Sequence, residues 1–173
     1  MVGGTGGGAR LVVFAGLPGV GKTSLARATA TGLDATYLRI DTIETAIQAT
    51  LTPVRGNPVG YVVAARVAAD QLRAGRPVVA DAVNGVAEAR RLWVDLAAGC
   101  AAPVRFVEVV CSDPAEHRRR VEARVPDLPG QSVPTWTDVQ DREWQPFTGD
   151  RLVVDNTGDP ADAVARVLTW LSS

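Results

Sequence analysis

The sequence predicts an α/β protein in which helices cover both faces of a five-stranded parallel sheet, giving three layers. Short apolar runs alternate along the chain with segments of helical periodicity, which is typical of this class. A glycine-rich loop lies between the first apolar run and the first helical segment. The five expected strands are Leu11–Ala15, Ala35–Ile40, Pro77–Asp81, Val104–Cys111 and Arg151–Asp155.

The glycine-rich loop from Gly16 to Thr23 reads GLPGVGKT and fits the pattern G-x-x-x-x-G-K-[ST] of a phosphate-binding loop. A strand is expected before it and a helix over Ser24–Ala30 after it, as its mechanism requires. Its glycines let backbone N–H groups point at phosphate oxygens, and the helix adds the positive end of its dipole. Because a chance match occurs about once per hundred chains of this length, we interpret it as a nucleotide loop.

Within this loop, Lys22 is expected to reach the β- and γ-phosphates of ATP, and the Thr23 hydroxyl to bind Mg²⁺. Lys22 is the only lysine of a chain that otherwise uses arginine for its cations. Arginine cannot replace the compact ammonium without changing reach and geometry. The residues expected to contact the nucleotide are Gly16, Pro18, Gly19, Val20, Gly21, Lys22, Thr23 and Ser24.

The composition is that of a soluble globular protein. The chain has 173 residues, of which 46% are hydrophobic and 21% charged, and a formal net charge of -1. This balance provides no global field for nucleic acid or for an anionic membrane. No apolar run reaches transmembrane length and no export leader precedes the first strand, so we expect a cytoplasmic protein. We expect a flexible Gly-rich tail over residues 1–10 and a single domain over residues 11–173.

Cysteine and histidine are too scarce for several kinds of site. Cys100 and Cys111 lie in or beside apolar runs, so we expect reduced packing cysteines and not a disulfide. His117 is the only histidine, which argues against a zinc cluster or a Ser-His-Asp triad. Its place in an arginine-rich helical stretch predicts a solvated side chain.

Two aspartates stand where strands are expected to end. Asp41 opens a helix, and with Glu44 three residues on it fits a capping box. It also ends a strand expected to lie next to the phosphate-loop strand, at the edge where open α/β sheets bind ligands. Asp81 ends the strand Pro77–Asp81 in a Walker-B pattern, which would hold Mg²⁺, and a turn or helix cap over Asp81–Gly85 is the alternative.

Helical segments are expected between the strands. Besides the one after the phosphate loop, they begin at or near Asp41, Val59, Val86, Asp113, Thr135 and Asp159. The loop Thr52–Pro58 contains Arg55, which is a candidate to face an acceptor.

An arginine-rich helix runs into a Pro/Gly-rich loop after the fourth strand. The helix carries Arg118, Arg119, Arg120 and Arg124, of which the last two are expected to be i,i+4 neighbours on one face. We interpret residues 118–134 as a lid that closes over a nucleotide. A charged helix face that is only solvated is the alternative.

Together these motifs resemble the small P-loop kinases over nearly the whole chain. The pattern is most similar to the group that holds chloramphenicol phosphotransferase, the zeta toxins, the polynucleotide-kinase P-loop domain and many uncharacterised bacterial ATPases. Arg39–Glu44 resembles the group's second-strand ending, especially in chloramphenicol phosphotransferase. Val107–Asp113 with the arginines after it resembles the fourth strand and lid helix, and Pro134–Trp136 and Val154–Thr157 resemble the carboxy-terminal part.

The resemblance implies phosphoryl transfer from ATP·Mg²⁺ to a hydroxyl group. The aspartate that matches Asp41 is the base for the acceptor hydroxyl in chloramphenicol phosphotransferase. The resemblance also implies that Thr23 binds Mg²⁺ directly and that Asp81 binds it through water. Arg124 would neutralise charge on the transferred group, and Arg120 would cover the adenine or a phosphate. Asn156 would contact the nucleotide.

The acceptor is the main open question. The span Asp41–Arg73 is expected to contain much of its pocket, and this span is apolar with a few Arg and Gln, which favours an antibiotic or sugar derivative. The alternatives are a polynucleotide or nucleoside 5'-hydroxyl kinase, a zeta-toxin-like nucleotide-sugar kinase, and an NTP-dependent switch that transfers nothing. The near-neutral charge argues against a polymer substrate. The sequence leaves open the choice between ATP and GTP and the oligomeric state.

Overall fold

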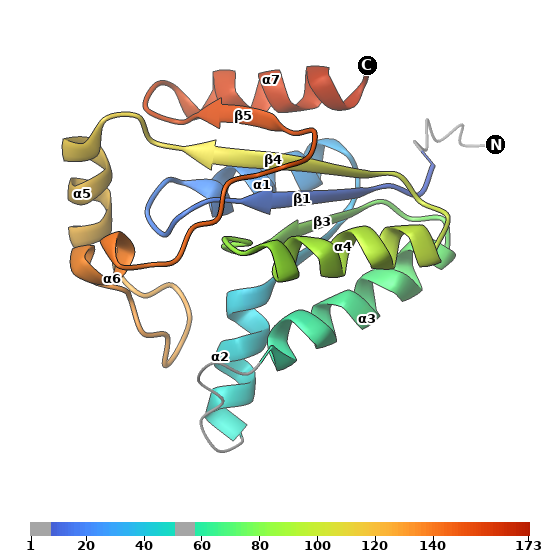
Figure 1. The fold of residues 1–173 in the computed structure, drawn as a ribbon, viewed down its shortest axis with the longest axis horizontal. Helices are drawn as coiled ribbons and strands as arrows, with labels where there is room; N and C mark the ends of the chain where they lie inside the picture. The colour runs from blue at the N-terminus through green and yellow to red at the C-terminus, as the bar shows by residue number, and fades with distance from the viewer. Residues whose placement is uncertain (1–7, 51–57) are drawn as a thin grey trace.

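The computed structural model describes residues 8–50 and 58–173, and its centre is one five-stranded parallel sheet (Figure 1). The strand order is β2-β3-β1-β4-β5, and every neighbouring pair is parallel. The strands are β1 (Leu11–Ala15), β2 (Thr36–Arg39), β3 (Val78–Asp81), β4 (Val104–Val110) and β5 (Leu152–Asp155). The expected five-stranded parallel sheet is therefore confirmed.

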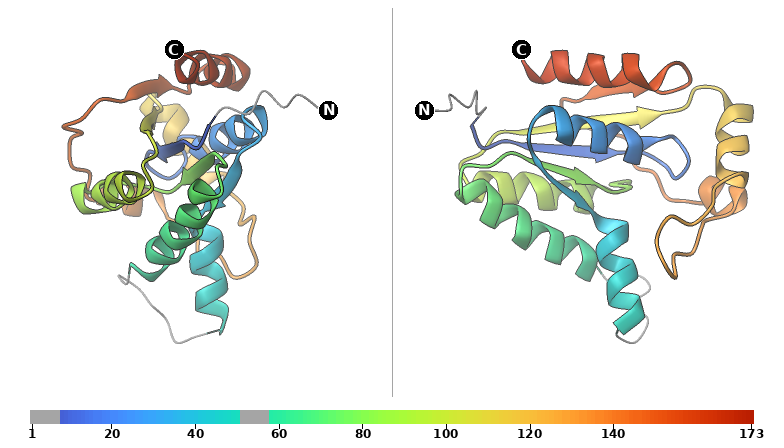
Figure 2. Two further views of the ribbon diagram at one scale, coloured as in Figure 1. Left: turned by 90° about the vertical axis from the view of Figure 1, so that its right-hand side faces the viewer. Right: turned by 180° about the vertical axis from the view of Figure 1, so that it is seen from behind.

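Helices cover both faces of the sheet (Figures 1 and 2). α3 and α4 lie on one face, and α1 and α7 lie on the other, while α5 and α6 stand beyond the carboxyl ends of the strands. The helices are α1 (Lys22–Gly32), α2 (Ile40–Thr50), α3 (Val59–Arg73), α4 (Ala87–Gly99), α5 (Pro114–Glu122), α6 (Trp136–Gln140) and α7 (Pro160–Leu171).

Alternate residues of the central strands enter two separate apolar cores. In β1, Leu11 and Val13 pack toward α3 and α4, where Trp93 is fully buried. Val12 and Phe14 face the other way, toward α1 and α7. Because both faces of a parallel sheet are covered, the strand reads as a continuous apolar run.

The strand order corrects one expectation. The strand before Asp41 was expected next to the phosphate-loop strand, but β3 lies between them and pairs with both β1 and β2. All four residues of β3 are buried, whereas three of the four in β2 are half-buried. The fully buried strand therefore takes a central place, and the half-buried strand takes the edge.

The helix caps mostly follow the sequence patterns. The Asp113 carboxylate accepts hydrogen bonds from the backbone of Ala115 and Glu116, and α6 begins with a complete capping box at Thr135. The capping box expected for Asp41 is wrong, because α2 begins at Ile40, directly after β2. Asp41 thus lies inside the first turn of the helix.

The arginine-rich helix after β4 is shorter than the sequence pattern predicts. α5 ends at Glu122, so Arg124 lies beyond the helix and is not an i,i+4 neighbour of Arg120 on it.

Cys100 and Cys111 are half-buried free thiols, as expected. Most of the expected tail, residues 1–7, and the loop residue Arg55 lie outside the described residues. Within the described part of the chain, no helix is long and apolar enough to cross a membrane.

Candidate active site

The phosphate loop joins β1 to α1 in a conformation that its glycines make accessible. Gly19 and Gly21 both have φ +87°, in the left-handed region where glycine carries no penalty. Gly21 is the N-cap of α1, and no side chain caps the helix there. The first N–H groups of the helix therefore face the loop without a side-chain acceptor, which suits an anion at this position.

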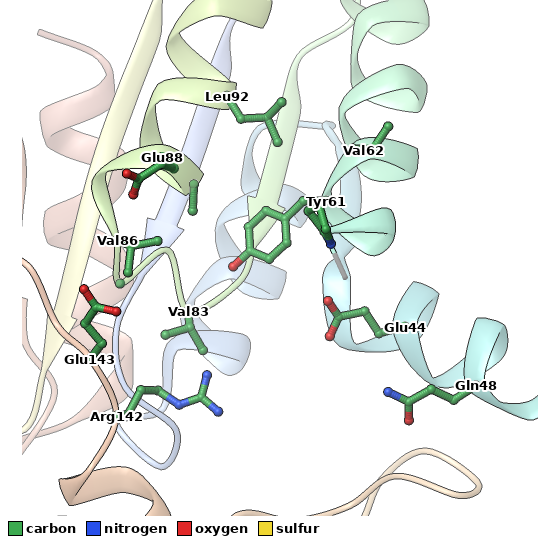
Figure 3. A pocket seen from close by; sticks show the side chains of 13 residues that line it. Glu44, Gln48, Tyr61, Val62, Val83, Val86, Glu88, Leu92, Arg142 and Glu143 are labelled. Atoms are coloured by element: carbon green, nitrogen blue, oxygen red, sulfur yellow. The ribbon is translucent and has the colours of Figure 1, made fainter. Parts of the chain in front are cut away.

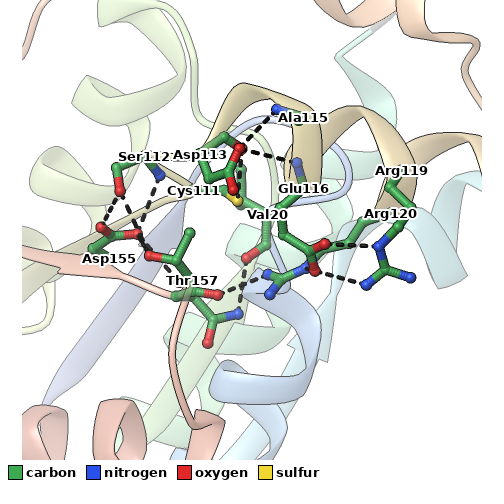
Figure 4. Close-up of polar contacts among 11 residues, drawn as sticks. Val20, Cys111, Ser112, Asp113, Ala115, Glu116, Arg119, Arg120, Asp155 and Thr157 are labelled. Atoms are coloured by element: carbon green, nitrogen blue, oxygen red, sulfur yellow. Dashed lines mark hydrogen bonds and ion pairs between the residues drawn. The ribbon is translucent and has the colours of Figure 1, made fainter.

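Side chains from distant segments hold the loop from behind. The buried Asn156 amide donates a 2.9 Å hydrogen bond to the carbonyl oxygen of Val20. Arg120 donates in turn to the Asn156 carbonyl oxygen at 2.7 Å (Figure 4). A Cβ atom on Gly21 would lie 2.1 Å from the Asn156 amide nitrogen. Asn156 and Arg120, expected to contact the nucleotide themselves, thus support the loop that would hold it.

His117 has a second supporting role, which corrects the expectation of a solvated side chain. It is only 7% exposed, and its Nε2 lies 2.8 Å from the Pro18 carbonyl oxygen. Because a carbonyl can only accept, Nε2 carries the donated hydrogen. The ring also meets Trp136 of α6 edge-on, with centroids 5.1 Å apart. α5 and α6 are therefore anchored on the phosphate loop.

The segment after β5 is held by a network of hydrogen bonds (Figure 4). The Asp155 carboxylate accepts hydrogen bonds from Ser112 and Thr157, and these bonds lower its pKa to about 2. This network joins the ends of β4 and β5, directly before Asn156.

Lys22 and Asp81 lie against each other at the base of the loop. Lys22 Nζ is 3.5 Å from Asp81 Oδ1, and both side chains are buried. The Tyr37 hydroxyl donates to Asp81 Oδ2 at 2.8 Å, and burial with the Asp81 charge raises the pKa of Tyr37. Asp81 is therefore engaged with Lys22 and Tyr37 and not with a turn. The turn after β3 is held by Asn84, which donates to the Phe14 carbonyl at 2.8 Å.

The structure offers few protein ligands for the Mg²⁺ ion that the sequence predicts. The described residues contain no cluster of three or more His, Cys, Asp and Glu side chains that could hold a metal ion. Thr23 is the last residue of the phosphate loop, Asp81 lies beside Lys22, and Asp81 Oδ1 accepts no hydrogen bond. Mg²⁺ is commonly held by one or two carboxylates together with substrate phosphates, so these residues fit the ion.

Asp41 faces the same cavity as Lys22. This cavity has a volume of about 640 Å³, and Arg124 and Gln131 of the lid segment also line it. Asp41 Oδ2 lies 3.6 Å from Arg39 and 3.9 Å from Arg124, and it accepts a 3.5 Å hydrogen bond from Gln131. Lys22, Asp41 and Arg124 thus line one cavity, whereas Arg120 is not among the residues that line it.

A buried arginine that the sequence reading missed ties the lid to the sheet. Arg39 ends β2, is 5% exposed, and donates two hydrogen bonds of 2.5 and 2.9 Å to the Asp127 carboxylate. This contact lowers the pKa of Asp127. Arg118 and Arg119 pair instead with Glu122 and Glu116 on the outer face of α5, so the solvated-face alternative applies to these two.

A second cavity of about 720 Å³ adjoins the first and lies between α2, α3 and the start of α4 (Figure 3). The residues that line both cavities are Glu44, Gln48, Tyr61, Val83 and Arg142. The expectation that Asp41–Arg73 contains much of the acceptor pocket thus fits the α2 and α3 walls. The sequence did not predict the wall formed by α4 and Arg142, because only the folded chain brings these distant segments to the cavity.

Residues 11–142 match a family model described as an AAA domain. The chain belongs to this AAA domain family. No curated protein sequence matches it.

Several solved structures resemble this AAA domain protein over nearly its whole length. The Mycobacterium tuberculosis APS kinase CysC, in complex with AMPPNP and APS, has a TM-score of 0.74 at 20% identity, covering 96% of this chain and 99% of that chain. A sugar kinase from Janibacter sp. HTCC2649 has a TM-score of 0.70 at 18% identity, covering 95% of each chain. A gluconokinase from Sinorhizobium meliloti 1021 has a TM-score of 0.62 at 17% identity, covering 94% of this chain and 95% of that chain. The similarity establishes the fold of the P-loop kinases.

Proposed function

We propose that this protein is an ATP-dependent kinase that transfers the γ-phosphate of ATP·Mg²⁺ to a hydroxyl group of a small molecule. The observation that carries the proposal is one cavity lined by both Lys22 of the phosphate loop and Asp41 of α2. The first residue suits the phosphate donor and the second suits the acceptor. The kinase names of the structures that share the fold support the same reaction.

The donor half consists of the phosphate loop and its supports. Backbone N–H groups from Gly19 to Thr23 would bind phosphate oxygens, and Lys22 would turn from Asp81 toward the β- and γ-phosphates. Mg²⁺, held by Thr23, Asp81 and the phosphates, would neutralise charge on the phosphate chain. Arg120 would support the loop indirectly, because it donates to the backbone oxygen of Asn156, whose side chain donates to the Val20 carbonyl.

The acceptor half is centred on Asp41. Its carboxylate would accept the proton of the acceptor hydroxyl and orient the oxygen toward the γ-phosphate. Arg39 holds this carboxylate from the buried side at 3.6 Å. Arg124, 3.9 Å from Asp41 and on the cavity wall, would neutralise charge on the transferred group. Gln131 adds a further contact from the lid segment.

Within the P-loop kinases, we propose a place near the group of chloramphenicol phosphotransferase and the zeta toxins, supported by the segment Arg39–Glu44. The acceptor is then a small molecule and not a nucleic acid, in keeping with the net charge of -1. Nucleosides and nucleotide-sugars belong to the same reaction class and are included in the test below.

The test is an ATP-consumption screen over antibiotics, sugars, nucleosides and nucleotide-sugars, with each product checked by mass for one added phosphoryl group. We expect one acceptor class to stimulate ADP release well above the rate with water. The Lys22→Ala variant should abolish this release and strongly weaken ATP binding, because no other lysine can replace the lost ammonium. Slow hydrolysis that no acceptor stimulates would refute the proposal and favour an NTP-dependent switch.

A further inference from the structure

The 720 Å³ cavity beside the proposed transfer site has a mixed wall. The apolar part comes from α3, α4 and the loop after β3 and includes Tyr61, Val83 and Leu92. The ionisable part consists of Glu44, Glu88, Glu143 and Arg142. In Figure 3 the Glu44 carboxylate and the Arg142 guanidinium extend from opposite sides toward the space between them.

The charge of this wall selects among acceptors. The described residues contribute three carboxylates and a single guanidinium, so the lining is acidic. An acceptor that carries its own carboxylate or phosphate would meet like charge here, whereas one that carries an ammonium group would meet opposite charge. The apolar side chains leave room for a carbon skeleton of moderate size beside the charged group.

Glu44 is the carboxylate placed to receive such a cation. It lines both cavities, and its side chain packs against the α3 backbone at Gly60, where a Cβ atom would lie 2.4 Å from Glu44 Cγ. Burial and the nearby Asp41 charge raise the pKa of Glu44, and Arg142 offsets this only in part. The attraction of a ligand cation would offset both the desolvation of this carboxylate and its repulsion by Asp41.

The spacing along α2 adds a geometric condition. Asp41 and Glu44 are three residues apart in one helix and so lie on the same face, with Cβ atoms about 5–6 Å apart. If a molecule binds with its hydroxyl at Asp41 and its ammonium at Glu44, these two groups of the molecule must also lie about 5–6 Å apart.

We propose that the acceptor is an amine-bearing hydroxyl compound with a partly apolar skeleton, which places its hydroxyl at Asp41 and its ammonium at Glu44. This inference rests on the proposed kinase function and narrows its substrate class. In the transfer, the bond from the γ-phosphorus to the bridging oxygen of ADP breaks and a bond to the acceptor oxygen forms. The hydroxyl proton passes to Asp41, and ADP leaves.

The experiment compares acceptors that differ only in charge. Amino sugars, aminoglycosides and aromatic amino alcohols are each paired with their N-acetyl derivatives, and sugar acids of similar size are added. Transfer is measured by product mass, and binding by calorimetry in the presence of a non-hydrolysable ATP analogue. We expect at least one amine to be phosphorylated, and its N-acetyl derivative and the sugar acids to react and bind at least tenfold less well.

Glu44→Gln tests the residue itself. Because a hydrogen bond to a charged group contributes roughly 1.5–3 kcal/mol, kcat/KM for the amine should fall by about 10- to 100-fold, with little change for neutral acceptors. Asp95→Asn is the matched control, since Asp95 is exposed on α4 and lies outside the cavity lining. Thermal unfolding of both variants, measured in parallel, identifies any loss caused by misfolding.

Two failures can be told apart. If neutral or anionic acceptors are phosphorylated better than amines, or if Glu44→Gln leaves the preference for amines unchanged, the inference is overturned and the kinase function stands. If no compound of this panel or of the wider screen described above is phosphorylated, the kinase function is refuted. The calorimetric comparison of each amine with its N-acetyl derivative then decides the charge preference of the cavity, and equal binding overturns it.

Discussion

At two glycines of the phosphate loop, the surrounding atoms leave no space for a side chain. Gly21 combines a left-handed backbone with direct contact to the Asn156 amide, so both its φ and its missing Cβ atom matter. Gly16 has a similar restriction, because a Cβ atom there would lie 2.5 Å from the Val109 carbonyl oxygen. The sequence motif predicts these glycines, but not the atoms that they contact.

We expect Gly21→Ala to lose most of its ATP affinity, because the added methyl group would displace Asn156 and with it the Val20 carbonyl. Gly75→Ala is the matched control. Gly75 has φ +79° and no atom within 4 Å of an added Cβ, so this variant carries the backbone strain without the collision. ATP binding by calorimetry should be normal in Gly75→Ala, and equal losses in the two variants would contradict the account.

Arg124 and Arg118 differ in what they contact, although both belong to the predicted lid. Arg124→Ala should lower turnover by about 10³-fold or more while changing ATP affinity much less, because a supplied arginine acts mainly on transition-state charge. Arg118→Ala removes only an exposed pair with Glu122 and should leave both parameters unchanged. Steady-state kinetics with separate ATP-binding measurements provide the check. A loss confined to ATP affinity in Arg124→Ala would show that the residue has a different role.

The residue-level predictions from sequence were best where a short motif carries the chemistry. Lys22 and Thr23 follow from one contiguous pattern. Arg39 and Asp127 did not, because they are 88 residues apart and only the fold brings them into contact. His117 was misjudged for a similar reason, since its partner Pro18 is 99 residues away. The available signal for Arg39 was its position, because it is an arginine at the end of an expected strand.

At the level of elements, the predicted lid segment and the residue before it contact both the phosphate loop and the sheet. α5 contacts the phosphate loop through His117 and Arg120, and the following loop contacts β2 through Arg39 and Asp127. Arg124 and Gln131 of this segment lie against Asp41, so an acceptor bound at Asp41 would also contact the predicted lid.

Asp127→Asn should loosen the loop between α5 and α6 without unfolding the protein, because it weakens a bidentate pair whose carboxylate is partly exposed. Hydrogen exchange over residues 123–134 should become faster in the variant than in the wild type. Since Arg39 lowers the pKa of Asp127, the contact is complete above the ordinary aspartate pKa and is lost as pH falls through the lowered value. The two proteins should therefore converge in acid, and equal exchange at neutral pH would contradict this role.

The order of the strands is the element-level feature that sequence reading could not supply. Each strand was found from its own apolar run, with ends within one residue of those in the structure. The position of β3 between β1 and β2 depends on pairing between distant segments, which no local pattern encodes. The correction preserves the proposed site, because Asp81 at the end of β3 then lies between the segments that carry Lys22 and Asp41.

For the whole molecule, the fold class was predictable because the alternation of apolar runs and helices extends over the entire chain. The charge of the 720 Å³ cavity was not predictable. Its wall combines Glu44 of α2, Glu88 of α4 and Arg142 after α6, which are far apart in the sequence.

Nucleotide binding should be visible as a change in the stability of the whole domain. A ligand at about 100 times its Kd stabilises the folded state by about 2.7 kcal/mol. For a protein of this size, this corresponds to a rise in Tm of about 5–10 °C. ATP with Mg²⁺ should produce this shift, excess EDTA should reduce it, and Lys22→Ala should remove it. An identical shift in Lys22→Ala would mean that ATP binds elsewhere.

The central claim is that Asp41 completes a transfer site whose donor half is the phosphate loop. It is tested most directly by measuring phosphorylated product and ATP binding in Asp41→Asn, with Asp162→Asn as a control that changes another aspartate in the first turn of a helix. We predict that Asp41→Asn binds ATP normally and forms product at least about 10²- to 10⁴-fold more slowly, as expected for loss of a general base, while Asp162→Asn behaves as the wild type. Unchanged product formation in Asp41→Asn would contradict the account.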